Sequence, residues 1–277
     1  MTMGEFIFTD KDFDRVTKLV NERTGIVLSD AKRQMVYGRL TRRLRALGLS
    51  EFSAYLKLVQ DDVNGELVNF VNAMTTNLTA FFRESHHFDY LANTALPRIM
   101  KTNAQTRQIR IWSAGCSTGE EPYSIVSTLR EIIPAGSGWD IKILATDLDS
   151  NVLNTAANGI YTAERVAGLS AKQLKRWFLK GKNEKTGMVR VKKELRDLIT
   201  FQQLNLMESW PVKGPFDLIF CRNVVIYFNK ETQRKLVNRY ADIMTPDANL
   251  FLGHSESLFK VSDRFKLIGN TIYQRTS

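Results

Sequence analysis

The feature that most constrains the fold is the stretch IRIWSAGCSTGEEPYS at residues 109–124. Its first six residues include two isoleucines and a tryptophan, a composition typical of a β-strand. Gly115 and Gly119 then bound a turn in which the chain reverses tightly, and two glutamates follow where the positive end of a helix dipole stabilises them. The stretch therefore predicts a strand, a glycine turn and a helix, the building unit of an α/β sheet.

An acid at the end of the second predicted strand indicates a ligand site. Residues 141–147 form a largely apolar run that ends in Asp147. At the carboxyl edge of a parallel sheet, such a carboxylate can accept both hydroxyls of a ribose, and a glycine turn can present backbone N–H groups to a nucleotide. Neither Gly-x-Gly-x-x-Gly nor the pattern ending in Gly-Lys-Ser/Thr follows the strand, so a nucleoside fits without a pyrophosphate. A plain strand-to-helix connection is the alternative interpretation of this turn.

Four ordered motifs carry a family resemblance that runs nearly from end to end of the chain. They are NLTAFFRE at 77–84, STGEEPYS at 117–124, FCRNVVIYF at 220–228 and GHSE at 253–256. Together they resemble the chemotaxis receptor methyltransferases, the CheR family. The resemblance implies an enzyme that uses S-adenosylmethionine to esterify glutamate side chains on bacterial chemoreceptors, with S-adenosylhomocysteine as product and no metal.

The resemblance also implies roles for individual residues. Arg83 offers a guanidinium fork suited to the methionine carboxylate of the cofactor, and Asn205 and Leu206 are expected near the adenine. The expected cofactor-binding residues are Asn77, Thr79, Arg83, Gly115, Glu120, Asp147, Asn205, Leu206, Arg222 and Asn223. Arg222 and Tyr227 are the expected catalytic residues, with Tyr227 positioning the substrate carboxylate. Because that carboxylate is already ionised near neutral pH, the transfer needs alignment and exclusion of water and no strong base.

Strands and helices alternate in the second part of the chain. Strands are predicted at 109–114, 141–147, 199–204, 216–221 and 248–253, helices at about 120–132, 149–158, 170–179 and 230–244, and a closing hairpin at 265–275. This pattern predicts an α/β fold, a Rossmann-like sheet of the S-adenosylmethionine-dependent methyltransferase type. The alternating residues 188–191 predict a small antiparallel β insertion at about 180–200. Some members of the family use such an insertion to hold the C-terminal tail of a receptor.

The first part of the chain predicts a small all-α domain. We expect residues 1–74 to form this domain, 75–90 a linker that contacts the cofactor, and 91–277 the methyltransferase domain. Helices are predicted from Thr9 to Gly25, from about Asp30, from Ser50 and from about Val63. In the second helix an apolar stripe consists of Val36, Leu40, Leu44 and Leu47. Arg39, Arg42 and Arg43 are expected to form a positive ridge beside this stripe that binds the receptor. The resemblance implies that the partner is the set of cytoplasmic helices of the chemoreceptor, which carry the target glutamates.

Composition excludes several other classes of protein. The chain has 277 residues, 43% of them hydrophobic, and no segment approaches the roughly 20 apolar residues of a membrane helix. Without a secretion signal at its start, we expect it in the cytoplasm. Two cysteines and three histidines show no metal-ligand spacing. Much of the net charge of +10 comes from residues 160–200, with 11 basic and 4 acidic side chains, but these lack the interleaved aromatics that stack nucleic-acid bases.

Other functions remain as alternatives to glutamate methylation. Residues 223–226 loosely resemble the Asn-Pro-Pro-aromatic loop of enzymes that methylate amino groups of RNA or protein, although both prolines are absent. A hydrolase is disfavoured because the sequence has no nucleophile elbow. A non-catalytic module that only binds receptors would keep the same fold. Asn223 as a helix cap and Tyr227 as a packing aromatic are the structural interpretations of those residues.

Overall fold

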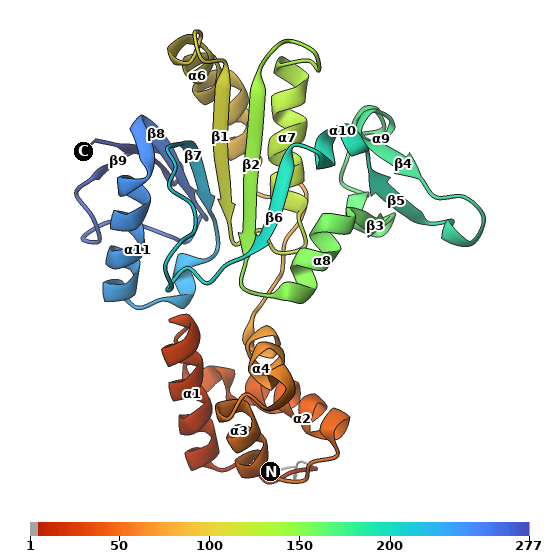
Figure 1. Ribbon diagram of the computed structural model, residues 1–277, viewed down its shortest axis with the longest axis vertical. Helices are drawn as coiled ribbons and strands as arrows, with labels where there is room; N and C mark the ends of the chain where they lie inside the picture. The colour runs from red at the N-terminus through yellow and green to blue at the C-terminus, as the bar shows by residue number, and fades with distance from the viewer. Residues whose placement is uncertain (1–4, 277) are drawn as a thin grey trace.

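The computed structural model describes residues 5–276, which form a helical part and an α/β part. Figure 1 shows the helical part at the bottom and the α/β part above it, joined by a single extended segment. We call this segment, residues 75–85, the linker. None of the helices in the described range is long and apolar enough to span a membrane.

The helical part forms around one hydrophobic core. Its elements are α1 (Asp10–Thr24), the 3-10 turn η1 (Asp30–Lys32), α2 (Arg33–Leu47), α3 (Phe52–Gln60), the turn η2 (Val63–Gly65) and α4 (Glu66–Met74). Thr9 caps α1 as predicted, in a reciprocal capping box with Asp12, and Gly25 ends the helix in the left-handed conformation. Leu40 and Leu44 of the predicted α2 stripe are fully buried, whereas Leu47 is 39% exposed and lies outside the core.

The α/β part contains a sheet of seven strands in the order β6-β2-β1-β7-β8-β10-β9. The strands are β1 (Gln108–Ala114), β2 (Asp140–Asp147), β6 (Ile199–Gln203), β7 (Phe216–Cys221), β8 (Met244–Leu252), β9 (Phe265–Gly269) and β10 (Ile272–Arg275). The first five named are mutually parallel, and the hairpin β9–β10 adds to β8 in antiparallel orientation. The predicted strands, the closing hairpin and the fold class are confirmed.

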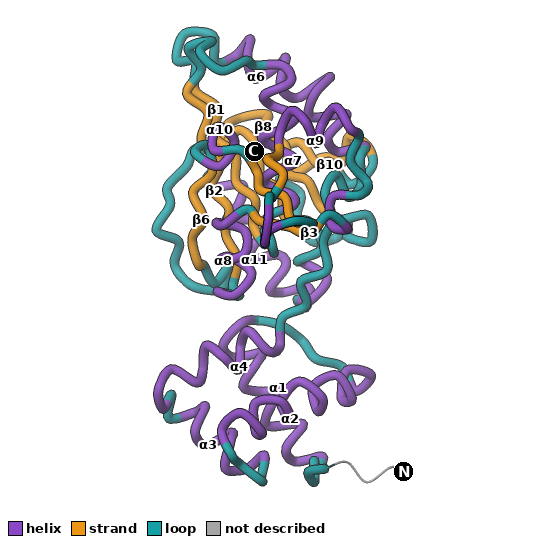
Figure 2. Tube along the Cα trace, turned by 90° about the vertical axis from the view of Figure 1, so that its right-hand side faces the viewer, coloured by secondary structure: helices purple, strands orange, loops and turns teal. Residues whose placement is uncertain are grey.

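Helices cover both faces of the sheet, so the α/β part has three layers (Figure 2). One face packs against a continuous helical segment and α7 (Glu120–Ile132), and the other packs against α11 (Lys230–Asp242). The continuous segment consists of α5 (His86–Tyr90), the π-helical turn η3 (Leu91–Ala95) and α6 (Leu96–Thr102). After β2, the helix α8 (Ser150–Asn158) packs beside β6.

A small sheet of three antiparallel strands extends from the α/β part at the right of Figure 1. It contains β3 (Ile160–Thr162), β4 (Phe178–Lys180) and β5 (Met188–Val191), in the order β3-β5-β4. The intervening elements are η4 (Glu164–Val166), α9 (Ala171–Trp177), η5 (Asn183–Lys185) and α10 (Lys193–Arg196). The small sheet therefore begins before the predicted insertion at about 180–200. The sequence did not predict β3 and β4, because each has only three residues and shows no alternating pattern.

The predicted positive ridge on α2 is wrong for two of its three arginines. Arg43 donates two hydrogen bonds of 2.9 and 2.7 Å to the buried carboxylate of Glu66 on α4. Arg39 donates to the backbone oxygens of Ala73 and Thr75 and thereby attaches α2 to the start of the linker. Both side chains reach neighbouring elements, and Arg42 is the member of the predicted trio that stays exposed.

Replacing Arg43 should therefore lower stability, which a solvated ridge would not predict. In Arg43→Met the carboxylate of Glu66 keeps its bonds from Tyr55 and Asn69 but loses its cationic partner. We expect a loss of about 1–3 kcal/mol in the free energy of unfolding, measured by denaturant titration. Arg42→Met is the matched control and should change that free energy little. Equal stability of the two variants would contradict the structural role of Arg43.

Candidate active site

The strand order locates the candidate site before any side chain is considered. From β1 the chain continues toward β2 and β6 on one side, whereas β7 and β8 lie on the other side. Ligands of doubly wound sheets bind at the carboxyl ends of the strands where this reversal occurs. A pocket that is open to solvent lies at this point. Further walls come from the linker and from the helical part, where residues 24, 26–28, 32, 35 and 74 line the pocket.

The pocket collects most of the predicted site residues. Tyr227 lines it, and so do nine of the ten expected cofactor-binding residues. These nine are Asn77, Thr79, Arg83, Gly115, Asp147, Asn205, Leu206, Arg222 and Asn223. The side-chain amide of Asn205 is engaged with protein groups, since it donates to the backbone oxygen of Arg23 at 2.7 Å and to Glu208 at 3.0 Å. A contact between Asn205 and an adenine would therefore use its backbone.

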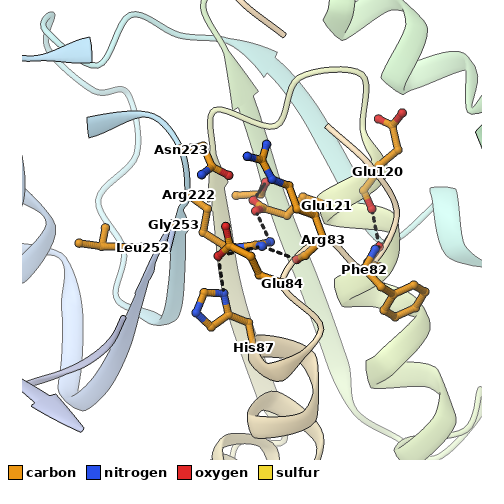
Figure 3. A network of polar contacts seen from close by, with 12 residues as sticks. Phe82, Arg83, Glu84, His87, Glu120, Glu121, Arg222, Asn223, Leu252 and Gly253 are labelled. Atoms are coloured by element: carbon orange, nitrogen blue, oxygen red, sulfur yellow. Dashed lines mark hydrogen bonds and ion pairs between the residues drawn. The ribbon is translucent and has the colours of Figure 1, made fainter. Parts of the chain in front are cut away.

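Glu120, the tenth predicted residue, lies outside the pocket lining, and Glu121 takes that place. The carboxylate of Glu120 pairs with Arg165 of the small-sheet region and accepts from Thr118. Figure 3 shows this carboxylate turned away from the group around Arg222, with Glu121 inside that group. Helix phase explains the difference, because Glu121 precedes the core residues Ile125 and Leu129 by four and eight positions. This signal was available in the sequence.

The glycine turn brings backbone close to the pocket. Gly115 has φ +94°, and a Cβ built on it would lie 2.4 Å from Cγ2 of Val224. Gly119 has φ +97°, and a Cβ there would lie 2.8 Å from the Cβ of Ala156 on α8. Only glycine fits both the conformation and the space at these two positions.

Two acids at the end of β2 hold the pocket walls. Asp147 accepts the backbone N–H of Ser117 at 2.7 Å, which ties the glycine turn to β2. Asp149, two residues later, accepts from Thr75 and from Asn77 of the linker, each at 2.8 Å. Asp149 and the pocket residue Ser117 are not among the predicted site residues. The second acid of the sequence Asp-Leu-Asp is a signal that could have identified Asp149.

Arg222 is the centre of a buried ion-pair network (Figure 3). Its guanidinium lies 3.1 Å from Glu121 and 3.3 Å from Glu84, and it donates to the backbone oxygen of Arg83. Burial raises the pKa of Glu121, which Arg222 opposes. Although burial opposes the shift, hydrogen bonding from His254 and the charge of Arg222 lower the pKa of Glu84 to about 2. Both terminal nitrogens of Arg222 thus have protein partners, one of them the backbone of Arg83, and its predicted catalytic role stays a prediction.

The GHSE motif supports the loop that carries Tyr227. Glu256 is buried and accepts the backbone N–H groups of Asn223 at 2.9 Å and Ile226 at 3.2 Å. Tyr227 ends the 3-10 turn η6 (Val225–Tyr227), and its backbone oxygen accepts from Val27 of the helical part at 2.8 Å. Asn223 caps none of the helices in the described range, whereas Tyr227 both lines the pocket and packs against the core of the helical part.

One group within residues 5–276 has ligand atoms arranged for a metal ion: Glu84, His86 and His87 offer atoms within 4.8 Å of one another. The guanidinium of Arg222 already lies 3.3 Å from Glu84, and a bound cation would have to share the carboxylate with it. Burial and the charge of Arg222 lower the pKa of His87 to about 4. Glu84 and its neighbouring histidines are therefore better suited to the ion-pair network than to a metal ion. Activity without a metal stays a prediction.

The fold and site define the class of protein. A Rossmann-like sheet with a glycine turn after β1 and an acid ending β2 is the architecture of nucleoside-binding methyltransferases that use S-adenosylmethionine. Residues 77–274 match the family model described as CheR methyltransferase, SAM binding domain, and residues 11–75 match CheR methyltransferase, all-alpha domain. The chain therefore belongs to the CheR methyltransferase family.

Curated relatives agree with this assignment over nearly their full length. A chemotaxis protein methyltransferase of Escherichia coli is 46% identical over 268 residues, covering 96% of this chain and 91% of the relative. The protein of the same description from Salmonella typhimurium is 47% identical, covering 96% and 90%. Chemotaxis protein methyltransferase 2 of Pseudomonas aeruginosa is 45% identical, covering 97% and 94%.

The pKa of Asp147 yields a prediction about cofactor binding. Burial raises this pKa to about 6, and only the ionised carboxylate can accept two ribose hydroxyls. Affinity for S-adenosylhomocysteine should therefore be constant above about pH 7 and fall by up to about tenfold per pH unit below pH 6. Calorimetry at several pH values measures this slope. Asp147→Asn should bind at least about tenfold more weakly at pH 8 and lose the slope; an unchanged slope would contradict the assignment.

Proposed function

We propose that this chain transfers the methyl group of S-adenosylmethionine to glutamate side chains of bacterial chemoreceptors, forming glutamyl methyl esters. The observation that carries the proposal is that Asp147, Arg83 and Tyr227, from three different segments, line one pocket. Family membership supports the methyltransferase chemistry. The relatives described as chemotaxis protein methyltransferases support a chemoreceptor substrate.

The pocket residues suit the cofactor, which would supply an electrophilic methyl group on a sulfonium. We assign Asp147 to the ribose hydroxyls and the apolar wall of Leu204 and Leu206 to the adenine. Arg83 donates one hydrogen bond of 2.9 Å to the backbone oxygen of Leu78, and its remaining N–H groups can bind the methionine carboxylate. Arg222 positions Arg83 through the backbone bond described above.

The acceptor chemistry favours a carboxylate over an amine. The described residues that line the pocket include no histidine, and the carboxylates of Asp147 and Glu121 are held by protein groups. An ionised glutamate needs no base before it attacks the methyl carbon. Burial raises the pKa of Tyr227, so its hydroxyl stays protonated and can donate to one oxygen of that glutamate while the other oxygen attacks.

Two exposed surfaces outside the pocket are proposed receptor contacts. Arg42 on α2 is the exposed remainder of the predicted ridge. The small sheet has two edge strands, β3 and β4, either of which can pair with an extended peptide such as a receptor tail. Exposed lysines on the small sheet would favour an acidic peptide.

Base-labile labelling tests the function directly. The protein is incubated with methyl-labelled S-adenosylmethionine and bacterial membranes enriched in chemoreceptor. We expect label on the receptor that is released as methanol in mild alkali, because a carboxyl ester hydrolyses there. Label that withstands alkali would indicate a methylated amine, and no label on receptor would reject the proposed substrate.

Removing the hydroxyl of Tyr227 tests its positioning role. Tyr227→Phe keeps the ring in the pocket and the backbone bond to Val27. Because a hydrogen bond to a charged group contributes about 1.5–3 kcal/mol, kcat/KM for receptor should fall about tenfold or more. Affinity for S-adenosylhomocysteine, measured by calorimetry, should be unchanged. Wild-type kcat/KM in Tyr227→Phe would remove this residue from the mechanism.

A further inference from the structure

Leu78 combines two properties that seldom occur together. It lines the pocket, yet it is 79% exposed, a value exceeded only by Ile7 among the exposed large hydrophobic residues of the described chain. Its neighbours Asn77 and Thr79 line the same pocket. A large apolar side chain in this position contributes little to the core, so its exposure calls for an explanation outside folding.

The backbone around Leu78 is firmly held. The backbone oxygen of Leu78 accepts from Arg83 at 2.9 Å, and that of Asn77 accepts from the Ser117 hydroxyl at 2.9 Å. The side-chain amide of Asn77 donates to Asp149 at 2.8 Å. The exposure of Leu78 is therefore a property of an anchored segment, and an apolar group presented in this way loses little conformational entropy when a partner covers it.

A second exposed apolar side chain stands next to a pocket residue in the loop after β7. Ile226 is 47% exposed and directly precedes the pocket residue Tyr227. Its backbone N–H is fixed by Glu256 at 3.2 Å. Leu78 and Ile226 thus belong to two anchored segments that both contribute to the pocket wall.

We propose that Leu78, together with Ile226, contacts the apolar side of the receptor helix that carries the target glutamate. This inference rests on the proposed function and names the contact that selects its substrate. A glutamate can reach the pocket only if its helix lies over the pocket mouth, which brings the neighbouring apolar side chains of an amphipathic helix against these residues. Covering Leu78 also removes water from the mouth, and water competes with alignment of the carboxylate.

Acidic substitutions test the contact through the Michaelis constant for receptor. In Leu78→Asp, KM for chemoreceptor in membranes should rise about tenfold or more, because an apolar contact is replaced by a desolvated charge. Leu78→Ala should give a smaller rise, and Ile226→Asp should also raise KM. Leu267→Asp is the matched control, since Leu267 is 55% exposed on β9 at the far edge of the sheet, and its KM should equal that of wild type.

S-adenosylhomocysteine affinity separates a receptor contact from a cofactor contact. Calorimetry of Leu78→Ala, which adds no charge beside Arg83, should give the wild-type dissociation constant and thermal unfolding the wild-type midpoint. An unchanged KM would overturn the inference while leaving the proposed function intact. A loss of cofactor affinity equal to the rise in KM would also overturn it, because Leu78 would then act on the cofactor. If the wild-type protein forms no alkali-labile ester on receptor, the proposed function fails and this inference fails with it.

Discussion

The buried carboxylates at the end of β2 are the constraint on which the pocket depends. Asp147 and Asp149 are less than 10% exposed, and a carboxylate in such a place is stable only when donors surround it. The donors come from the glycine turn for Asp147 and from the linker for Asp149. Movement of either wall away from β2 would remove a donor from a buried carboxylate, so the pocket is preformed although its walls are distant in sequence.

Much of this arrangement can be predicted from sequence because parallel strands end at one sheet edge. Polar residues that directly follow apolar runs, such as Asp147, Arg222 and Asn223, must then converge. The same argument fails for side chains whose direction depends on partners from other elements. Arg43 donates to Glu66, and Arg39 donates to the start of the linker. The pattern of the α2 sequence contains neither partner, so Arg39 and Arg43 cannot be distinguished there from the exposed Arg42.

Glu120 and Glu121 are adjacent in the sequence but point in different directions from α7, so they contact different parts of the molecule. Glu121 faces β1 and Arg222, where it helps to hold the pocket. Glu120 faces Arg165, while the hydroxyl of Tyr161 on β3 donates to the backbone oxygen of Thr118 at 2.7 Å. Adjacent glutamates at the start of α7 therefore attach the glycine turn to the sheet on one side and to the small-sheet region on the other.

The distribution of positive charge depends on which basic side chains pair with carboxylates. Near the pocket, Arg222 and Arg165 face carboxylates and contribute little field outside the molecule. The excess that makes the net charge +10 is carried by exposed residues such as Arg42 and by Lys182 and Lys185 in the connection between β4 and β5. Exposed charges speed encounter with an acidic partner but contribute little affinity once screened by salt. Under the proposed function, selection of one glutamate among many would then depend on short-range contacts at the pocket mouth, where Leu78 and Ile226 belong to anchored segments.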